Sequence, residues 1–294
     1  MLRAAAVQLR CGRDKAANIK KAAELVSAAA SRGARLVALP EAFTGLYGTQ
    51  YFAGSAERWL EAGSGTAAMS ALAKEHGVYV CGGVIEACAA SDKLYNTIGA
   101  FGPAGEELAR YRKLHLSCVS VSADTTAEAD VLTAGDGLSS FAADGWTVGL
   151  ACCFDLRFKD LAAALTDPPP LGLGAGVVLY PSAWLKSTGE LGHWEGLLAA
   201  RALDGQCYTV GANQTRDDQQ ETVFYGRSVF YGPLGQQLAV IGDDTKDGVV
   251  LADLCPDELA DARRRIPLRR VRGYRPESWF RDQAADAAAR RPNV

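Results

Sequence analysis

The chain has few of the residues that build metal centres, disulfide frameworks and membrane anchors. Its three histidines lie far apart in the sequence, and none of its eight cysteines belongs to a Cys-x-x-Cys pair. This pattern favours neither a zinc site nor a disulfide framework. The apolar runs are too short for a membrane-spanning helix, and the apolar part of the N-terminus is too short for a signal peptide. We therefore expect free thiols, no metal, no cofactor, no membrane contact and a cytoplasmic location.

The chain also lacks a strong excess of either charge. It carries 31 lysine and arginine residues against 34 aspartate and glutamate residues, for a formal net charge of −3. This balance gives no electrostatic reason to expect binding to nucleic acid or to an anionic membrane surface. Hydrophobic residues make up 48% of the chain and charged residues 22%, which are typical values for a globular protein.

A buried strand that ends at two cysteines is the central feature of the pattern. Residues 147–151 are small, apolar or β-branched, as in a strand covered on both faces. Cys152 and Cys153 follow, and a helical pattern begins at Phe158. A cysteine at such a corner lies at the carboxyl edge of a sheet, where backbone amides can stabilise a thiolate or an oxyanion. The alternative is that both cysteines are small core residues, the more common fate of a free cysteine.

The two halves of the chain share a pattern of strands and turns. ALPEAF at 38–43 resembles LYPSAW at 179–184, and AFGPAGEELA at 100–109 resembles FYGPLGQQLA at 230–239. An internal repeat of this kind indicates one domain built as two stacked layers. The predicted fold class is α/β, a four-layer α-β-β-α sandwich with two mixed β-sheets and an internal pseudo-two-fold repeat.

We expect one domain over residues 1–274 and a C-terminal tail over residues 275–294. The stretch DPPPLGLG at 167–174 interrupts the second half, because its prolines and glycines cannot continue a helix. The role of this insert, residues 166–176, is left open.

Three residues at expected strand ends carry reactive groups: Glu41, Lys113 and Cys153. Singly, a solvated acid, an edge-strand charge and a core thiol would each be ordinary. Together with their flanks they resemble the nitrilase, or carbon–nitrogen hydrolase, superfamily, whose signature is a Glu-Lys-Cys triad. The resemblance extends from about residue 3 to Tyr274. The blocks that carry it are LPEAF, YRKLHL, CFDLRF, YNT at 95–97, AEADVLTAG at 127–135, YPSAW at 180–184 and HWEGLLAARALDGQCY at 193–208.

The resemblance implies that Cys153 is the nucleophile, Glu41 the general base, and Lys113 with the Phe154 backbone amide the oxyanion donors. These residue types suit the chemistry. A thiolate attacks an amide better than water does, and a nearby carboxylate can accept the thiol proton and later activate water. A fixed ammonium and a backbone N–H can stabilise the oxyanion.

Other residues are expected to support this site. Glu128 in AEADVLTAG matches the family's second glutamate, which positions the substrate or the lysine. Tyr47, in the aromatic loop after Glu41, and Trp184, in YPSAW, are further candidates for substrate binding or support. The family usually has an aliphatic residue before the nucleophile, where this chain has Cys152. The register of FDLRF assigns the nucleophile to Cys153.

Within the superfamily the chain resembles the Nit branch. The resemblance implies a thiol amidohydrolase that releases ammonia from a small carboxylate-bearing amide through a cysteine acyl-enzyme. TRDD at 215–218 favours an ω-amidase, which cleaves the terminal amide of α-keto acid monoamides. ALDGQCY at 202–208 favours a deaminated-glutathione amidase, so the choice stays open. Both substrates are anionic, yet the donor for their carboxylate is unassigned, because Arg157 is interpreted as the ion-pair partner of Asp155.

Other functions remain alternatives. An N-carbamoyl amidase of the ureidopropionase type or a true nitrilase would use the same fold. A non-catalytic interaction protein is disfavoured because the three reactive residues are intact. A cysteine protease would need a histidine base, but His115 is expected to hold its own loop by hydrogen bonds and His193 to cap or pack the helix that follows it.

The expected partners are a small-molecule amide and further copies of the chain. The segment RRRIPLRRVRGYR at 263–275 mixes basic residues with apolar ones. The resemblance implies that it packs over a neighbouring subunit. It also implies a homodimer or higher even oligomer, whose interface includes the helices that follow Cys153 and His193.

Replacing the nucleophile tests the assignment of the two cysteines. Cys153→Ala should lower amide hydrolysis at least about 10³-fold, because the attacking thiol is gone, while the protein still folds. Cys152→Ala should fold and should not abolish hydrolysis. Ammonia release and circular dichroism measure both effects. An inactive Cys152 variant with an unmodified Cys153 would reverse the assignment.

Overall fold

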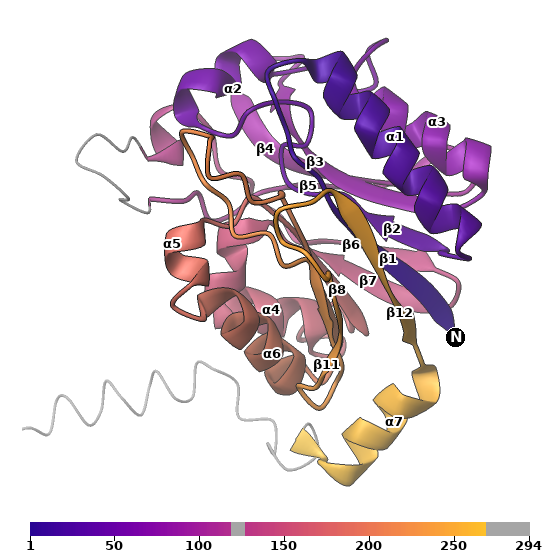
Figure 1. Cartoon of the computed structure of the whole chain (residues 1–294). Coiled ribbons are helices and arrows are strands. Elements are labelled where there is room, and N and C mark those ends of the chain that lie inside the picture. The colour runs from indigo at the N-terminus through magenta and orange to yellow at the C-terminus, as the bar shows by residue number, and fades with distance from the viewer. Residues whose placement is uncertain (119–126, 269–294) are drawn as a thin grey trace, which may run out of the picture.

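Two six-stranded β-sheets lie face to face between layers of helices (Figure 1) in the computed structural model, which describes residues 1–118 and 127–268. The strand order of the first sheet is β12 (Gly248–Leu254), β1 (Leu2–Gln8), β2 (Leu36–Ala38), β3 (Tyr79–Ala87), β4 (Leu94–Phe101) and β5 (Glu107–Arg112). The order of the second is β11 (Gln237–Val240), β10 (Val229–Tyr231), β9 (Tyr208–Asn213), β8 (Val177–Ser182), β7 (Trp146–Leu150) and β6 (Ser139–Ala143).

Both sheets have the same pairing pattern. In the first, β1, β2 and β3 are parallel, and the flanking pairs are antiparallel. In the second, β7, β8 and β9 are parallel, again with antiparallel flanks. The hairpins β4–β5 and β10–β11 turn at Gly105 and Gly235, whose φ angles of +86° and +75° suit glycine. The predicted fold class and its internal repeat are therefore confirmed.

Strand β1 shows how each inner strand contributes to two cores. Ala4 and Ala6 belong to the core between the sheets, whereas Ala5 and Val7 pack with apolar side chains of α1 (Lys15–Ser31) and α3 (Gly65–His76). Successive side chains of a strand point to opposite faces, so a strand between two apolar layers needs apolar residues at every position.

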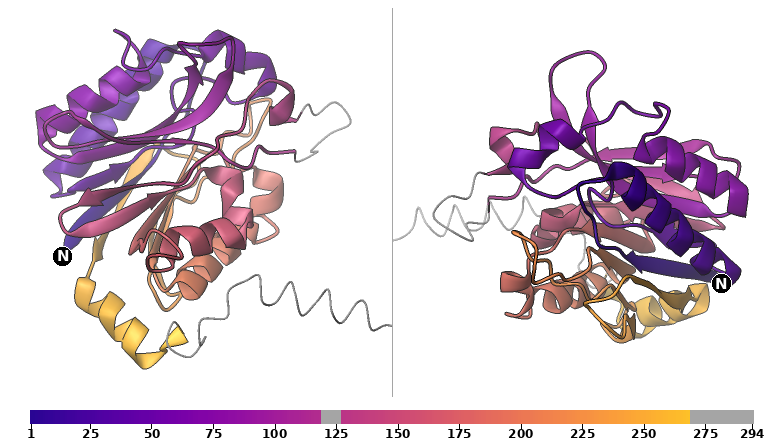
Figure 2. Two further views of the ribbon diagram at one scale, coloured as in Figure 1. Left: turned by 180° about the vertical axis from the view of Figure 1, so that it is seen from behind. Right: turned by 45° about the horizontal axis from the view of Figure 1, so that its top comes forward.

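The helices cover the outer faces of the sandwich (Figure 2). Helices α1 and α3 lie on the first sheet, and α4 (Lys159–Thr166) and α6 (His193–Gly205) lie on the second. Asp14 and Ser64 cap the N-termini of α1 and α3 by accepting hydrogen bonds from Ala17 N and Ala67 N. Helix α7 (Pro256–Arg265) follows β12 at the end of the sandwich. Among residues 1–118 and 127–268, no helix has the length and apolar character that crossing a membrane requires.

The structure contains short elements that the sequence pattern did not predict. These are β6, α2 (Thr49–Ser55), α5 (Lys186–Gly189) and two 3₁₀ helices, η1 (Glu128–Asp130) and η2 (Cys153–Arg157). Each is too short to show a clear helical or strand period. The proposed domain boundary at 274 and most of the basic segment 263–275 lie outside the described residues.

Candidate active site

Reactive side chains from both sheets meet at the ends of their strands. Glu41 follows β2, Lys113 follows β5, and Cys153 begins η2, with two residues between it and the end of β7. Glu128 begins η1, in the segment after β5. The structure thus brings together the three residues expected as a triad and places the second expected glutamate beside them.

The Lys113 ammonium lies between two carboxylates. Its Nζ atom is 2.9 Å from Glu41 Oε1 and 2.9 Å from Glu128 Oε2, and all three side chains are at most 2% exposed. Asn96 on β4 bridges the same carboxylates, because its Nδ2 donates to Glu41 Oε1 at 2.6 Å and to Glu128 Oε1 at 3.2 Å. The Tyr47 hydroxyl donates to Glu128 Oε1 at 2.7 Å. These contacts satisfy charges that burial would otherwise make very costly.

The charges of this network set the protonation of its members. Burial works against charge on Lys113, but Glu128 and Glu41 outweigh it and raise the pKa of Lys113 well above its ordinary value. Burial also opposes charge on Glu128, whereas the Lys113 charge and the Ser117 backbone N–H lower its pKa overall. Burial and the negative charge of Glu41 raise the pKa of Cys153 well above the usual thiol value. Cys153 is therefore a neutral thiol beside a carboxylate that can accept its proton.

Groups from both sheets hold the side chain and the backbone of Glu41. Ala183 N, just after β8, donates to Glu41 Oε2 at 2.8 Å, and Gln214 Nε2 donates to the Glu41 carbonyl oxygen at 2.9 Å. Gly83 on β3 allows the close approach of this loop, because a Cβ atom there would lie 2.8 Å from Glu41 Cα. Any larger residue at 83 would displace the carboxylate.

Cys153 occupies a strained turn that Asp155 holds in place. Its φ angle of +45° lies in the left-handed region, which a non-glycine residue enters only where its surroundings impose it. Asp155 Oδ2 accepts from Cys152 N at 2.9 Å and from the Tyr111 hydroxyl at 2.7 Å, and Asp155 Oδ1 lies 2.7 Å from His115 Nδ1. Because Tyr111 and His115 flank Lys113, these bonds connect the cysteine turn to the lysine segment.

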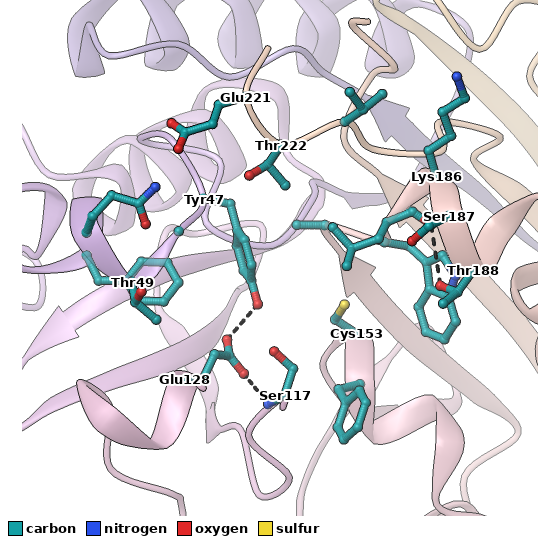
Figure 3. Close-up of a pocket in the computed structure, with 18 of the residues that line it drawn as sticks. Tyr47, Thr49, Ser117, Glu128, Cys153, Lys186, Ser187, Thr188, Glu221 and Thr222 are labelled. Atoms are coloured by element: carbon teal, nitrogen blue, oxygen red, sulfur yellow. Dashed lines mark hydrogen bonds between the residues drawn. The ribbon is translucent and has the colours of Figure 1, made fainter. Parts of the chain in front are cut away.

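A cavity of about 570 Å³ opens above the Cys153 sulfur. Figure 3 shows the sulfur pointing into this cavity, with Tyr47 and Glu128 on one side and Ser187 and Thr188 on the other. Phe154, Trp184 and Arg157 also line it, whereas Glu41 and Lys113 are fully buried behind it. The volume suits a small organic substrate.

The expected ion pair between Arg157 and Asp155 is absent, and that interpretation of Arg157 was wrong. Asp155 accepts hydrogen bonds from Cys152 in the turn and from Tyr111 in the lysine segment. Arg157 instead lines the cavity wall. There the guanidinium lies 4.5 Å from the centre of the Trp184 ring, and its Nη1 lies 3.3 Å from His193 Nδ1. Arg157 forms no ion pair with any described carboxylate, and its buried Nε has no hydrogen-bond partner. Burial lowers the pKa of Arg157, but an arginine side chain remains cationic.

Sequence reasoning missed several groups of the site. Asn96 lies in the quoted block YNT, but its contact with both carboxylates depends on strand pairing that the sequence does not show. The Ala183 amide carries no side-chain signal at all. Among the described residues, no three His, Cys, Asp or Glu side chains are grouped so that they could hold a metal ion.

Comparison with known proteins identifies the family of the chain. The family model for carbon-nitrogen hydrolases matches residues 3–264. The chain belongs to the carbon-nitrogen hydrolase family. It is thus a hydrolase of carbon–nitrogen bonds other than peptide bonds.

Similar proteins within this family include two named Omega-amidase NIT2. The one from Xenopus tropicalis is 38% identical over 91% of this chain and 94% of its own length, and the one from Homo sapiens is 38% identical over 90% and 93%. The crystal structure of Saccharomyces cerevisiae Nit3, described as a member of branch 10 of the nitrilase superfamily, is 29% identical and has a TM-score of 0.80. That comparison covers 91% of this chain and 94% of Nit3.

Replacing Glu41, the expected proton acceptor, tests its role in this hydrolase. Glu41→Gln keeps the shape of the side chain but cannot accept the thiol proton, so amide turnover should fall about 100-fold or more. A matched control is Glu86→Gln, which alters another buried, ion-paired glutamate of the same sheet, bound to Arg112 at 2.7 Å. Steady-state ammonia release compares the two variants. If Glu41→Gln keeps more than about a tenth of the normal rate, Glu41 is not the base.

Proposed function

We propose that this carbon-nitrogen hydrolase is a thiol amidase that releases ammonia from a small amide carrying a carboxylate, as an ω-amidase does. The observation that carries the proposal is Arg157, a cation without an acidic partner in the wall of the cavity that contains Cys153. The resemblance to proteins named Omega-amidase NIT2 supports it. The carboxylate of the substrate would bind Arg157 while its amide reaches Cys153.

Acylation begins at the Cys153–Glu41 pair. As the Cys153 sulfur attacks the amide carbon, Glu41 accepts the thiol proton. The carbonyl oxygen becomes an oxyanion, which Lys113 Nζ and the backbone N–H of Phe154 stabilise. Glu41 then returns the proton to the amide nitrogen, the carbon–nitrogen bond breaks, and ammonia leaves. An acyl thioester remains on Cys153.

Deacylation uses the same groups with water. Glu41 removes a proton from a water molecule that attacks the thioester carbon, and Lys113 again stabilises the oxyanion. The carbon–sulfur bond then breaks, Cys153 recovers its proton from Glu41, and the carboxylate product leaves. Glu128 does not take part in proton transfer. The Glu128 carboxylate holds the Lys113 ammonium in place, and the Tyr47 hydroxyl fixes the orientation of that carboxylate.

Arg157 suits a carboxylate because its surroundings hold it without neutralising it. The Trp184 and Phe154 rings lie 4.5 Å and 5.5 Å from the guanidinium carbon. An arginine nitrogen can only donate, so His193 must accept at Nδ1. Lys186, the other cation of the cavity wall, is paired with Asp218 at 2.9 Å. A substrate carboxylate therefore finds its strongest unpaired cation at Arg157.

We further propose a homodimer or a higher even oligomer in the cytoplasm. Leu203 on α6 is 46% exposed, Leu191 before α6 is 71% exposed, and Phe158 at the start of α4 is also exposed. These apolar side chains lie on or next to the helices expected at the interface. The cytoplasmic location is supported by the eight cysteines, all of which are free. Sedimentation velocity of Leu203→Glu should show smaller particles than the unmodified protein. An unchanged sedimentation coefficient would remove α6 from the interface.

A substrate panel tests the proposed reaction. Ammonia release should be fastest from an α-keto acid ω-monoamide and from succinamic acid, and slow from butyramide, which lacks the carboxylate. Deaminated glutathione, an N-carbamoyl amino acid and an aliphatic nitrile test the alternatives, with carbon dioxide release identifying carbamoyl cleavage. Preference for the neutral amide or for the nitrile would reject the proposal.

Arg157→Met separates carboxylate binding from chemistry. Loss of a charge-assisted contact should lower kcat/KM for succinamic acid roughly 10- to 100-fold, mostly through KM. The value for butyramide should change less than about threefold, because that substrate makes no such contact. Lys186→Met is the matched control, since it removes a cation that is already paired. Equal losses for both amides would show that Arg157 does not bind the carboxylate.

A further inference from the structure

Two thiols, not one, face the carboxylate of Glu41. Besides Cys153, the thiol of Cys152 lies 3.2 Å from Glu41 Oε1 and 3.6 Å from Asn96 Oδ1. Cys152 is 0% exposed. Burial and the negative charge of Glu41 raise its pKa well above the usual thiol value, so Cys152 stays protonated. A protonated thiol beside two acceptors is a hydrogen-bond donor.

The donors around Glu41 are divided unequally between its oxygens. Oε1 accepts from Lys113 Nζ at 2.9 Å, from Asn96 Nδ2 at 2.6 Å and from the Cys152 thiol at 3.2 Å. Oε2 accepts from Ala183 N at 2.8 Å. A carboxylate oxygen has about two lone-pair sites, so Oε1 has three donors sharing about two sites, whereas Oε2 has one donor and room for another proton. The oxygen left for the Cys153 proton is therefore Oε2.

We propose that Cys152 is a positioning residue for the general base: its thiol donates to Glu41 Oε1, helps to keep that carboxylate ionised, and leaves Oε2 free to accept the proton of Cys153. This inference rests on the proposed function, in which Glu41 is the base. The inference gives Cys152 a role, whereas the proposed mechanism uses only Cys153. Cys152 takes no part in bond making or breaking.

The other groups around this carboxylate are accounted for. Among the described residues, the titratable and charged side chains that face Glu41 and the two thiols are Lys113 and Tyr111 from the β5 segment, Glu128 from η1, Tyr47 from the loop after Glu41, and Asp155 and Arg157 from η2. Burial and the Asp155 charge raise the pKa of Tyr111, and burial and the Glu128 charge raise that of Tyr47, so both stay neutral. Changing Cys152 alters none of these charges.

Three variants separate the donor from the shape of the side chain. Cys152→Ala removes the donor and leaves a void, Cys152→Val removes the donor and fills the space, and Cys152→Ser keeps a donor. Cys207→Ala is the matched control, because this buried thiol donates to a backbone carbonyl at 3.7 Å on the far side of the second sheet. Thermal unfolding by circular dichroism shows which variants fold.

The first measurement is the pH dependence of kcat/KM for succinamic acid. A donor to the ionised carboxylate favours the ionised form, so losing it should move the acidic limb of the profile to higher pH. We expect a shift of about half to one pH unit for the Ala and Val variants, since a thiol is a weak donor to a charged acceptor. The Ser variant and the Cys207 control should stay within about 0.3 unit of the unmodified enzyme.

The second measurement requires no amide substrate. The rate at which iodoacetamide alkylates Cys153, followed by tandem mass spectrometry, should show the same shift in its pH profile, because Glu41 takes the thiol proton in both reactions. If the unmodified protein hydrolyses no amide but alkylation shifts as expected, the proposed function fails and the role of Cys152 stands. The role of Cys152 is overturned if both profiles are unchanged in the Ala and Val variants, or if Ser shifts them as much as Val does.

Discussion

The buried ammonium of Lys113 is the constraint on which the rest of the site depends. A charge that no water reaches is stable only where opposite charges and hydrogen bonds surround it, and here Glu41 and Glu128 lie on either side. These residues come from three segments, so the segments must meet in one arrangement. Asn96 and Tyr47 complete the contacts. The layer of charge behind Cys153 is thus part of the folded core.

The site separates this fixed inner layer from an open outer layer. Glu41 and Lys113 are sealed behind Cys153, while Phe154, Arg157 and Trp184 face the cavity. In the proposed mechanism the inner layer can serve any amide, because it acts only on the reacting atoms. The outer layer contacts the remainder of the substrate, and its unpaired cation, Arg157, favours one with a carboxylate. The proposal thus assigns reaction type and substrate choice to different residues.

The internal repeat explains why both halves of the chain contribute to one site. Each sheet has three parallel strands in its middle, and their carboxyl ends are where loops with reactive groups emerge. Pro40 with Glu41 after β2 and Pro181 with Ser182 in β8 occupy matching places. The first half supplies the carboxylate. The second half supplies the Ala183 amide that holds it.

The sequence alone determined the sandwich and its repeat, because apolar runs and paired Gly-Pro-x-Gly turns are local signals. It also picked out Glu41, Lys113 and Cys153 through their flanks. It could not determine the partner of Arg157. Asp155 is its near neighbour in sequence, but the strained turn at Cys153 directs the two side chains to different places. Nor could it show that Cys152 faces Glu41 or that Asn96 bridges two carboxylates. Such contacts join residues far apart in the chain, and only the packing of the two sheets brings them within hydrogen-bond distance.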